Sequence, residues 1–260
     1  MRPNNVRTVW AKGEVAINGW LSIPSSVSAE NMAQANWDSL TIDLQHGLID
    51  YSTALGMLQA ISTTQVTPLA RIPWFDPGII GKMLDAGAYG IICPMINSAI
   101  ECEAFVGACR YAPRGYRSVG PTRAVWYGGQ DYVREADKTV LTFAMIETTK
   151  AVDNLDEILS VPGLDAIYVG PADLSLSLGY GPVINPMHPD VVDVIRKIAE
   201  KAKPTNVKAC AHSTSTAHAK ELIAMGYELT TLPNDSIMLG QISKNWVAAM
   251  RDGSPSKPNA

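Results

Sequence analysis

The most constraining feature of this sequence is the alternation of short apolar segments with longer segments that carry helix signals. The apolar segments are uncharged along most of their length and apolar on both faces, which is typical of buried parallel strands. They cover residues 15–23, 39–45, 66–72, 90–95, 141–147, 165–170, 207–212 and 227–233. Strands that alternate with helices predict a parallel sheet covered by helices, and eight such units in 260 residues predict a single α/β domain, a (β/α)₈ TIM barrel.

Helix signals lie between the predicted strands. Ser28, Asp76 and Ser98 each precede a helical stretch and are predicted N-caps, because their side chains can accept hydrogen bonds from the first free backbone N–H groups. Gly87 and Gly226 are predicted to end helices in a left-handed conformation. We expect the barrel to occupy residues 1–250 and residues 251–260, which are rich in Pro and Ser, to form a flexible tail.

Composition narrows the classes of partner. Hydrophobic residues make up 47% of the chain and charged residues 18%, and the formal net charge is −4, so no basic field for nucleic acid is expected. No stretch of about 20 apolar residues is present, and the polar start lacks the apolar region of a signal peptide. These features predict a cytoplasmic protein without a membrane or nucleic-acid partner.

Four polar residues follow or end predicted strands. They are His46, Arg71, Glu147 and Asp173. The carboxyl ends of parallel strands meet at one end of a barrel, where the active sites of such barrels are built. The sequence therefore predicts that these side chains, although distant in the chain, converge on one site.

Glu147 and Asp173 are candidate metal ligands, because carboxylate oxygens suit Mg²⁺ or Mn²⁺. Two protein carboxylates would leave positions for a 2-oxo acid. The alternative is that Glu147 is an acidic residue at a helix start and Asp173 a loop cap. Arg71 could pair with a substrate carboxylate or form a structural salt bridge.

His46 lies three residues after Asp43, and a carboxylate that orients an imidazole makes a usable general acid or base. A purely structural histidine is an equally open interpretation. Gly170 opens a turn that could present the N–H of Ala172 to a substrate carboxylate, although a turn glycine needs no such role. His212 ends the seventh predicted strand and is a further candidate for lining the mouth of the barrel.

Several motifs resemble the HpcH/HpaI family, the class II pyruvate aldolases that include the 4-hydroxy-2-oxoheptanedioate aldolases. The motifs are IDLQHG, ARIPWFDPGIIGKMLDAGAYGIICPMI, YAPRGYRSVGPTRA, MIET and VPGLDAIYVGPADLSLSLG, in family order. The resemblance runs from about residue 19 to about residue 249. It implies a barrel that assembles as a hexamer, a dimer of trimers, with its last helix exchanged between subunits, and a mechanism that requires Mg²⁺, Mn²⁺ or Co²⁺.

The resemblance also implies residue roles. It puts Glu147 and Asp173 on the metal, Arg71 on the 2-oxo acid, and His46 beside the reacting oxygen with Asp43 as its partner. It further implies that Asp85 assists His46, that Trp20 helps to wall the pocket, and that the Ala172 amide contacts the substrate carboxylate. Gly170 is expected to be a substrate-binding residue. Met145 stands where the family often has Gln, and Gln45 where it often has Glu. Met145 is thus predicted to remove a polar group from the pocket.

The implied activity is reversible cleavage of a 4-hydroxy-2-oxo acid into pyruvate or hydroxypyruvate and an aldehyde. Two alternatives stay open. A citrate-lyase-type enzyme that cleaves CoA thioesters would share the two carboxylates but would need a basic cleft, against which the 21 Lys and Arg residues argue only weakly. A barrel that binds a keto acid without catalysis would retain the same residues and show no turnover.

Overall fold

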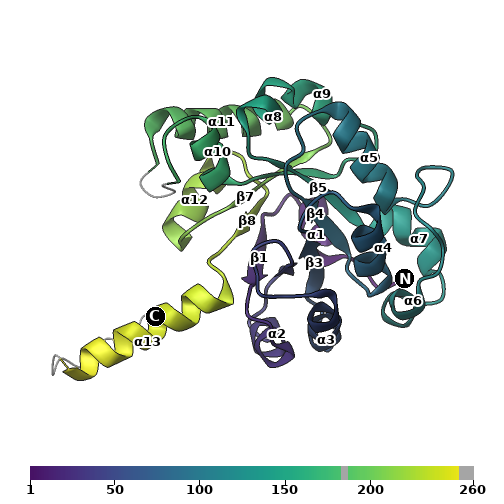
Figure 1. The fold of residues 1–260 in the computed structure, drawn as a ribbon, viewed down its shortest axis with the longest axis horizontal. Coiled ribbons are helices and arrows are strands. Elements are labelled where there is room, and N and C mark those ends of the chain that lie inside the picture. The colour runs from purple at the N-terminus through teal and green to yellow at the C-terminus, as the bar shows by residue number, and fades with distance from the viewer. Residues whose placement is uncertain (183–186, 252–260) are drawn as a thin grey trace.

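A computed structural model describes residues 1–182 and 187–251, and within them the predicted barrel is confirmed. Eight parallel strands close in sequence order, β1 pairing with both β2 and β8 (Figure 1). The strands are β1 (Ala16–Leu21), β2 (Ser39–Asp43), β3 (Thr67–Arg71), β4 (Gly90–Cys93), β5 (Leu141–Ile146), β6 (Ala166–Val169), β7 (Lys208–His212) and β8 (Leu229–Thr231). Each lies inside one of the eight predicted segments.

The helices surround the barrel and, except for the last one, pack against it (Figure 1). They are α1 (Asn5–Ala11), α2 (Ser26–Ala33), α3 (Tyr51–Ile61), α4 (Pro77–Asp85), α5 (Ala99–Cys109), α6 (Thr122–Gly128), α7 (Tyr132–Thr139), α8 (Thr149–Asp153), α9 (Leu155–Leu159), α10 (Pro171–Ser177), α11 (Pro189–Ala202), α12 (Thr216–Ala224) and α13 (Asp235–Arg251). In the described residues no helix is long and apolar enough to span a membrane.

Most of the predicted helix boundaries are confirmed. The side chains of Asp76 and Ser98 accept hydrogen bonds from the first turns of α4 and α5. Gly87 and Gly226 have φ angles of 106° and 105°, the left-handed region in which glycine carries no steric penalty. The prediction for Ser28 is wrong, because Ser25 caps α2 and Ser28 lies within its first turn, where its N–H donates to Ser25.

The amino-terminal helix α1 closes the lower end of the barrel, which is the end at which the strands begin. Val6 and Trp10 pack against Leu141 and Phe143, which point into the barrel interior. Trp10 Nε1 also donates to the carbonyl oxygen of Glu228 at 2.8 Å. This apolar plug fills the lower end, so the space for a ligand is left at the other end, where the strands finish.

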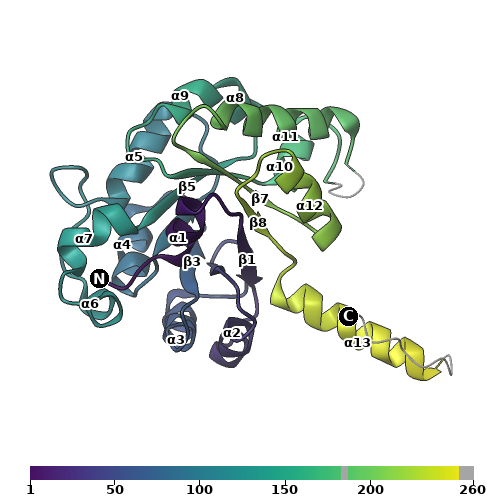
Figure 2. The same cartoon turned by 180° about the vertical axis from the view of Figure 1, so that it is seen from behind.

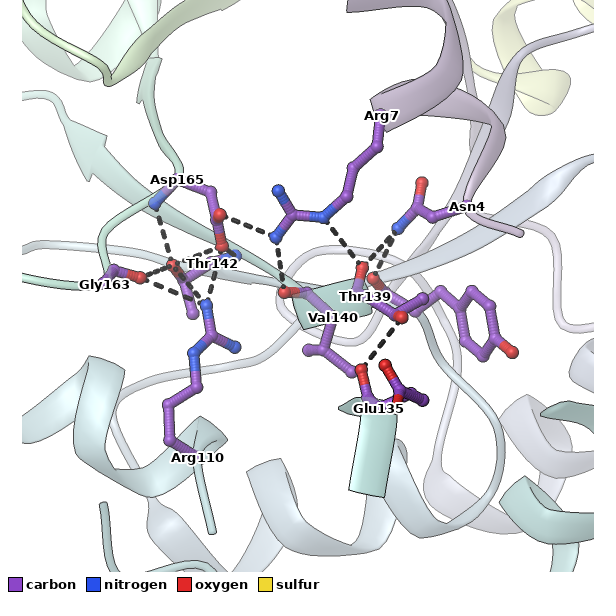
Figure 3. A network of polar contacts seen from close by, with 10 residues as sticks. Asn4, Arg7, Arg110, Glu135, Thr139, Val140, Thr142, Gly163 and Asp165 are labelled. Atoms are coloured by element: carbon purple, nitrogen blue, oxygen red, sulfur yellow. Dashed lines mark hydrogen bonds and ion pairs between the residues drawn. The ribbon is translucent and has the colours of Figure 1, made fainter. Parts of the chain in front are cut away.

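A network of ion pairs fixes the same lower end (Figure 3). The carboxylate of Asp165, just before β6, accepts from Arg7 Nη2 at 2.6 Å and from Arg110 Nη2 at 2.7 Å. It also accepts from the Thr142 backbone N–H at 2.9 Å. The network joins α1 and the end of α5 to β5 and β6. It lies where the strands begin, the end of such barrels that serves stability rather than catalysis.

The last helix, α13, projects from the barrel (Figures 1 and 2). Its first residue, Asp235, is buried and accepts from the N–H of Ser22 at 2.9 Å and from Ser28 Oγ at 2.9 Å. Beyond this anchor its apolar residues are exposed, with 65% of Trp246 and 84% of Met250 accessible. Residues 252–260, predicted to be a flexible tail, lie outside the described residues.

Candidate active site

A cavity of about 350 Å³ opens at the carboxyl ends of the strands. Most of the residues predicted for the site line it: Trp20, Asp43, His46, Arg71, Met145, Gly170, Ala172 and Asp173. Other polar residues that line it had not been assigned to the site: Ser22, Tyr168, Asn234 and Ser236. His212, considered only as a further candidate, is also part of the wall. The convergence of distant strand ends on one cavity is therefore observed.

Asp43 and Arg71 end the neighbouring strands β2 and β3 and face each other across them. Arg71 donates through Nε to Asp43 Oδ1 at 2.8 Å and through Nη2 to Oδ2 at 2.6 Å, and Trp20 Nε1 donates to Oδ2 at 3.1 Å. Burial alone would raise the pKa of Asp43, but the Arg71 and Trp20 contacts lower it below the usual value. The carboxylate is thus held ionised.

This pairing corrects one predicted contact. Asp43 was expected to orient the imidazole of His46, but its side chain accepts from the His46 backbone N–H at 3.3 Å and from the Gln45 N–H at 3.1 Å. The His46 side chain is exposed at the mouth of the cavity. Asp43 uses two of the five N–H donors of Arg71, so two on Nη1 and one on Nη2 make no hydrogen bond to a described residue.

Glu147 follows β5 and is buried, with 2% of its surface accessible. Its Oε1 accepts from the backbone N–H of Met95 at 2.7 Å. Met95 has a φ angle of 57°, an uncommon conformation for a residue with a side chain, and this conformation is often found at functional sites. Burial and the nearby charge of Asp173 raise the pKa of Glu147 to about 7.

The chemistry of these two carboxylates fits a divalent cation. Positive charge between Glu147 and Asp173 would offset the repulsion that raises the pKa of Glu147. No cluster of three His, Cys, Asp or Glu residues suited to a metal occurs in the described part of the chain. A cation here would therefore have two protein ligands and would take its other ligands from water or substrate.

Gly170 and Met145 shape the floor beside this pair. A Cβ atom on Gly170 would lie 2.6 Å from Glu147 Oε2 and 3.2 Å from Met145 Cε. Any residue other than glycine would therefore displace the Glu147 carboxylate. Gly170 is the residue before α10, and Asp173 lies in the first turn of this helix. Met145 lines the cavity with an apolar side chain, as predicted.

The structure does not bring Asp85 to this cavity. Asp85 is the last residue of α4, and its carboxylate pairs with Arg117 Nη2 at 2.7 Å. The helices of a (β/α)₈ barrel run opposite to the strands, so the last residue of α4 lies towards the amino-terminal ends of the strands. The sequence placed Asp85 by resemblance alone, and within one chain its contact is structural.

Tyr168 and His212 form the back of the cavity. Tyr168 lies on β6, and its hydroxyl group is 2.6 Å from Thr231 Oγ1 and 3.3 Å from His212 Nδ1. The His212 ring stands edge-on to Trp20, with 5.2 Å between the ring centroids. Only the position of His212 at a strand end could have indicated this group, because Tyr168 lies within an apolar strand.

The fold and the cavity define a class of protein: a (β/α)₈ barrel with a cavity at the carboxyl end of its strands, lined by one arginine and the two carboxylates of Asp43 and Asp173. Residues 18–238 match the HpcH/HpaI aldolase/citrate lyase family, and the chain belongs to this family. The family predicted from the motifs is therefore confirmed.

Similar proteins agree with this membership. The chain is 39% identical over 248 residues to a hydroxypyruvate/pyruvate aldolase of Rhizorhabdus wittichii, covering 95% of this chain and 99% of the relative. It is 33% identical over 244 residues to a 4-hydroxy-2-oxo-heptane-1,7-dioate aldolase of Escherichia coli, covering 93% and 92%. A crystal structure of a family member from Burkholderia cenocepacia superimposes with a TM-score of 0.89 at 30% identity, covering 95% and 99%. The chain is thus a carbon–carbon lyase of the aldolase type, as predicted.

Proposed function

We propose that this chain is a metal-dependent aldolase that reversibly cleaves 4-hydroxy-2-oxo acids into pyruvate or hydroxypyruvate and an aldehyde. The observation that carries the proposal is that Arg71 and Asp173 line one cavity, while Glu147, which is buried and does not line it, lies near enough for the charges of both to act on its carboxyl group. The names of the two relatives above support the same substrate class.

Glu147 and Asp173 would hold the divalent metal, Mg²⁺, Mn²⁺ or Co²⁺. A cation in this place supplies positive charge that stabilises the negative charge developing on the keto oxygen of the 2-oxo acid. Arg71 binds the same substrate through N–H donors that Asp43 leaves free, and its planar group is held in one orientation by the two bonds to Asp43. The backbone N–H of Ala172 contacts the substrate carboxylate.

His46 is proposed to move the proton. Its side chain is exposed at the cavity mouth, where it can reach both solvent and a bound substrate. In the synthetic direction it takes a proton from the carbon next to the keto group, directly or through a water molecule. Asp43 accepts a hydrogen bond from the backbone N–H of His46 and not from its imidazole, so the imidazole is oriented by the substrate or by water.

The citrate-lyase-type alternative has less support. A CoA thioester carries phosphate groups that require a basic surface, and the described residues that line the cavity include one arginine and no lysine. A barrel that binds a keto acid without catalysis would need the same residues, so it is separated from the aldolase by a turnover assay.

The test of the proposed function is metal removal followed by metal return. EDTA should abolish cleavage of 4-hydroxy-2-oxo acids, and Mn²⁺, Mg²⁺ or Co²⁺ should restore it. Asp173→Asn should bind Mn²⁺ at least about 10-fold more weakly, because an anionic ligand becomes a neutral amide. Full turnover after chelation, or a lysine adduct with pyruvate trapped by borohydride, would contradict the proposal.

We also propose that the chain assembles as a hexamer, a dimer of trimers, in which α13 packs on a second copy. An apolar groove of about 610 Å³ lies between α2 and the start of α13, lined by Ile23, Val27, Met32, Met238, Leu239 and Ile242 among others. Val27 is 72% exposed in the single chain. The exposed residues of α13 and the residues that line this groove are both apolar, and exchange of the helix between subunits would cover both surfaces.

A further inference from the structure

His212 lines the cavity, and one of its ring nitrogens has no hydrogen-bond partner among the described residues. The ring lines the cavity, Nδ1 lies 3.3 Å from the Tyr168 hydroxyl oxygen, and Nε2 makes no hydrogen bond with any described residue. A neutral imidazole carries one proton, so Nε2 is either a donor or an acceptor depending on which nitrogen holds that proton. The hydrogen bonds behind the ring decide between the two.

The chain of hydrogen bonds begins at Asn18, a buried residue on β1. One end of its amide lies 3.2 Å from the carbonyl oxygens of Ser39 and of Gly19. Carbonyl oxygens only accept hydrogen bonds, so this end is the nitrogen. The amide oxygen then points at Thr231 Oγ1, 2.8 Å away, and Thr231 must donate its proton to it.

The remaining directions follow from this assignment. Because the Thr231 proton is used, Tyr168 donates its hydroxyl proton to Thr231 Oγ1 over 2.6 Å. Burial raises the pKa of Tyr168, so this proton stays in place. The Tyr168 oxygen is then free to accept, and His212 Nδ1–H donates to it. Burial and the charge of Arg71 lower the pKa of His212 to about 4, so the ring is neutral near pH 7 and Nε2 keeps a lone pair.

We propose that His212 Nε2 accepts a hydrogen bond from a hydroxyl group of the substrate and thereby favours hydroxylated substrates over their deoxy analogues. The inference rests on the proposed aldolase function and names its substrate class. The hydroxyl group belongs either to the 2-oxo acid, on the carbon next to the keto group, or to the aldehyde. A hydrogen atom in place of this hydroxyl group, as in the deoxy analogue, would leave the Nε2 acceptor without a partner, which costs binding energy. Asn18, Thr231 and Tyr168 are positioning residues that set the proton on Nδ1.

The test compares substrate pairs in His212→Phe and in the unchanged protein loaded with Mn²⁺. One arm measures kcat/KM for hydroxypyruvate and for pyruvate with a common aldehyde. The other measures kcat/KM for glycolaldehyde and for acetaldehyde with a common 2-oxo acid. We expect one of the two ratios to fall by roughly 10-fold, the worth of one hydrogen bond. The arm that changes identifies which substrate carries the recognised hydroxyl group.

Tyr168→Phe tests the positioning role without altering the ring that meets the substrate. It removes the acceptor of Nδ1–H, so the proton can move to Nε2, and the same ratio should fall by about 3-fold or more. Tyr227→Phe is the matched control, because Tyr227 is equally buried and donates to the Ile195 carbonyl oxygen away from the cavity. This control should leave both ratios unchanged.

The outcomes separate the inference from the proposed function. Aldol activity with unchanged ratios in His212→Phe, or in Tyr168→Phe if the first variant does not fold, would overturn the role of His212 and leave the aldolase intact. No aldol activity of the unchanged protein with any of the four substrates would overturn the proposed function, and the inference with it.

Discussion

Asp43 shows how the hydrogen bonds of one residue can organise a site. Its carboxylate accepts from Arg71, from Trp20 and from two backbone N–H groups of the following turn. It therefore fixes the orientation of Arg71 and the path of the chain that carries His46. The sequence indicated the Asp43 and His46 pair by spacing, but the partner in space is a residue from the next strand.

Asp43→Asn should therefore weaken both folding and catalysis. The substitution leaves Arg71 as a buried cation without its counter-ion, which destabilises a protein by about 3 kcal/mol, and it frees the guanidinium to rotate. We expect a lower urea midpoint and a fall in kcat/KM for pyruvate of about 10-fold or more. Asp193→Asn is the control, since it breaks an exposed pair with Arg196 that contributes about 1 kcal/mol or less. Equal effects of the two variants would refute the role given to Asp43.

His212 predicts a dependence of stability on pH. Its pKa is lowered from 6.5 to about 4 in the folded chain, so between these values the unfolded chain binds a proton that the folded chain does not. Unfolding is thus favoured as the pH falls, and the residue should cost about 2 kcal/mol of stability between pH 7 and pH 5. Urea unfolding should show this loss in the unchanged protein and a smaller loss in His212→Gln. Parallel curves for the two proteins would contradict the prediction.

At the scale of the element, strands were easier to predict than the connections around them. All eight strands lie within predicted segments, because buried parallel strands are apolar throughout and short. Helix boundaries depend on single capping side chains, and the cap of α2 lies three residues before the predicted one because Ser25 and Ser28 carry the same signal. Local sequence could not choose between the two serines, because the Ser28 hydroxyl group donates to Asp235, which is more than 200 residues away in the chain.

The turn between β6 and α10 gives a prediction at this scale. Gly170→Ala places a methyl group 2.6 Å from Glu147 Oε2, so the carboxylate must move. Gly170 has a φ angle of −96°, which alanine adopts without strain, so the effect should be local. We expect Mn²⁺ affinity and turnover to fall about 10-fold or more with little change in the melting temperature.

Gly81→Ala is the control for this substitution. A Cβ atom at Gly81, within α4, meets no atom within 4 Å, and alanine is the better helix former by about 1 kcal/mol. Activity should be unchanged and stability slightly raised. Normal Mn²⁺ binding in Gly170→Ala, measured by calorimetry, would show that the close contact does not hold the carboxylate in place.

At the scale of the whole molecule, the proposed hexamer depends on α13. Its apolar residues are exposed in the single chain, which is unfavourable unless another surface covers them. Trp246→Asp should therefore shift the mass measured by light scattering from hexamer towards smaller species. Ile100→Asp, on α5, is the control because Ile100 is 79% exposed but lies outside α13. A variant with the mass of the unchanged protein would count against helix exchange.

The sequence by itself determined the barrel, the order of its strands and the end at which the site forms. These features follow from short-range patterns: apolar strands, helix caps, and polar residues such as Glu147 and Asp173 placed at strand ends. Spacing and motifs were enough to find most of the residues that line the cavity.

Only the tertiary structure decided which partner each of these residues has. Arg71 rather than the His46 imidazole pairs with the Asp43 carboxylate, Asp85 turns to Arg117, and Tyr168 meets His212 behind the cavity. Such partners lie on different strands, helices or loops that are distant in the sequence, so no local sequence pattern predicts them. Their choice depends on strand register and on which donors other groups have already used, and both are properties of the closed barrel.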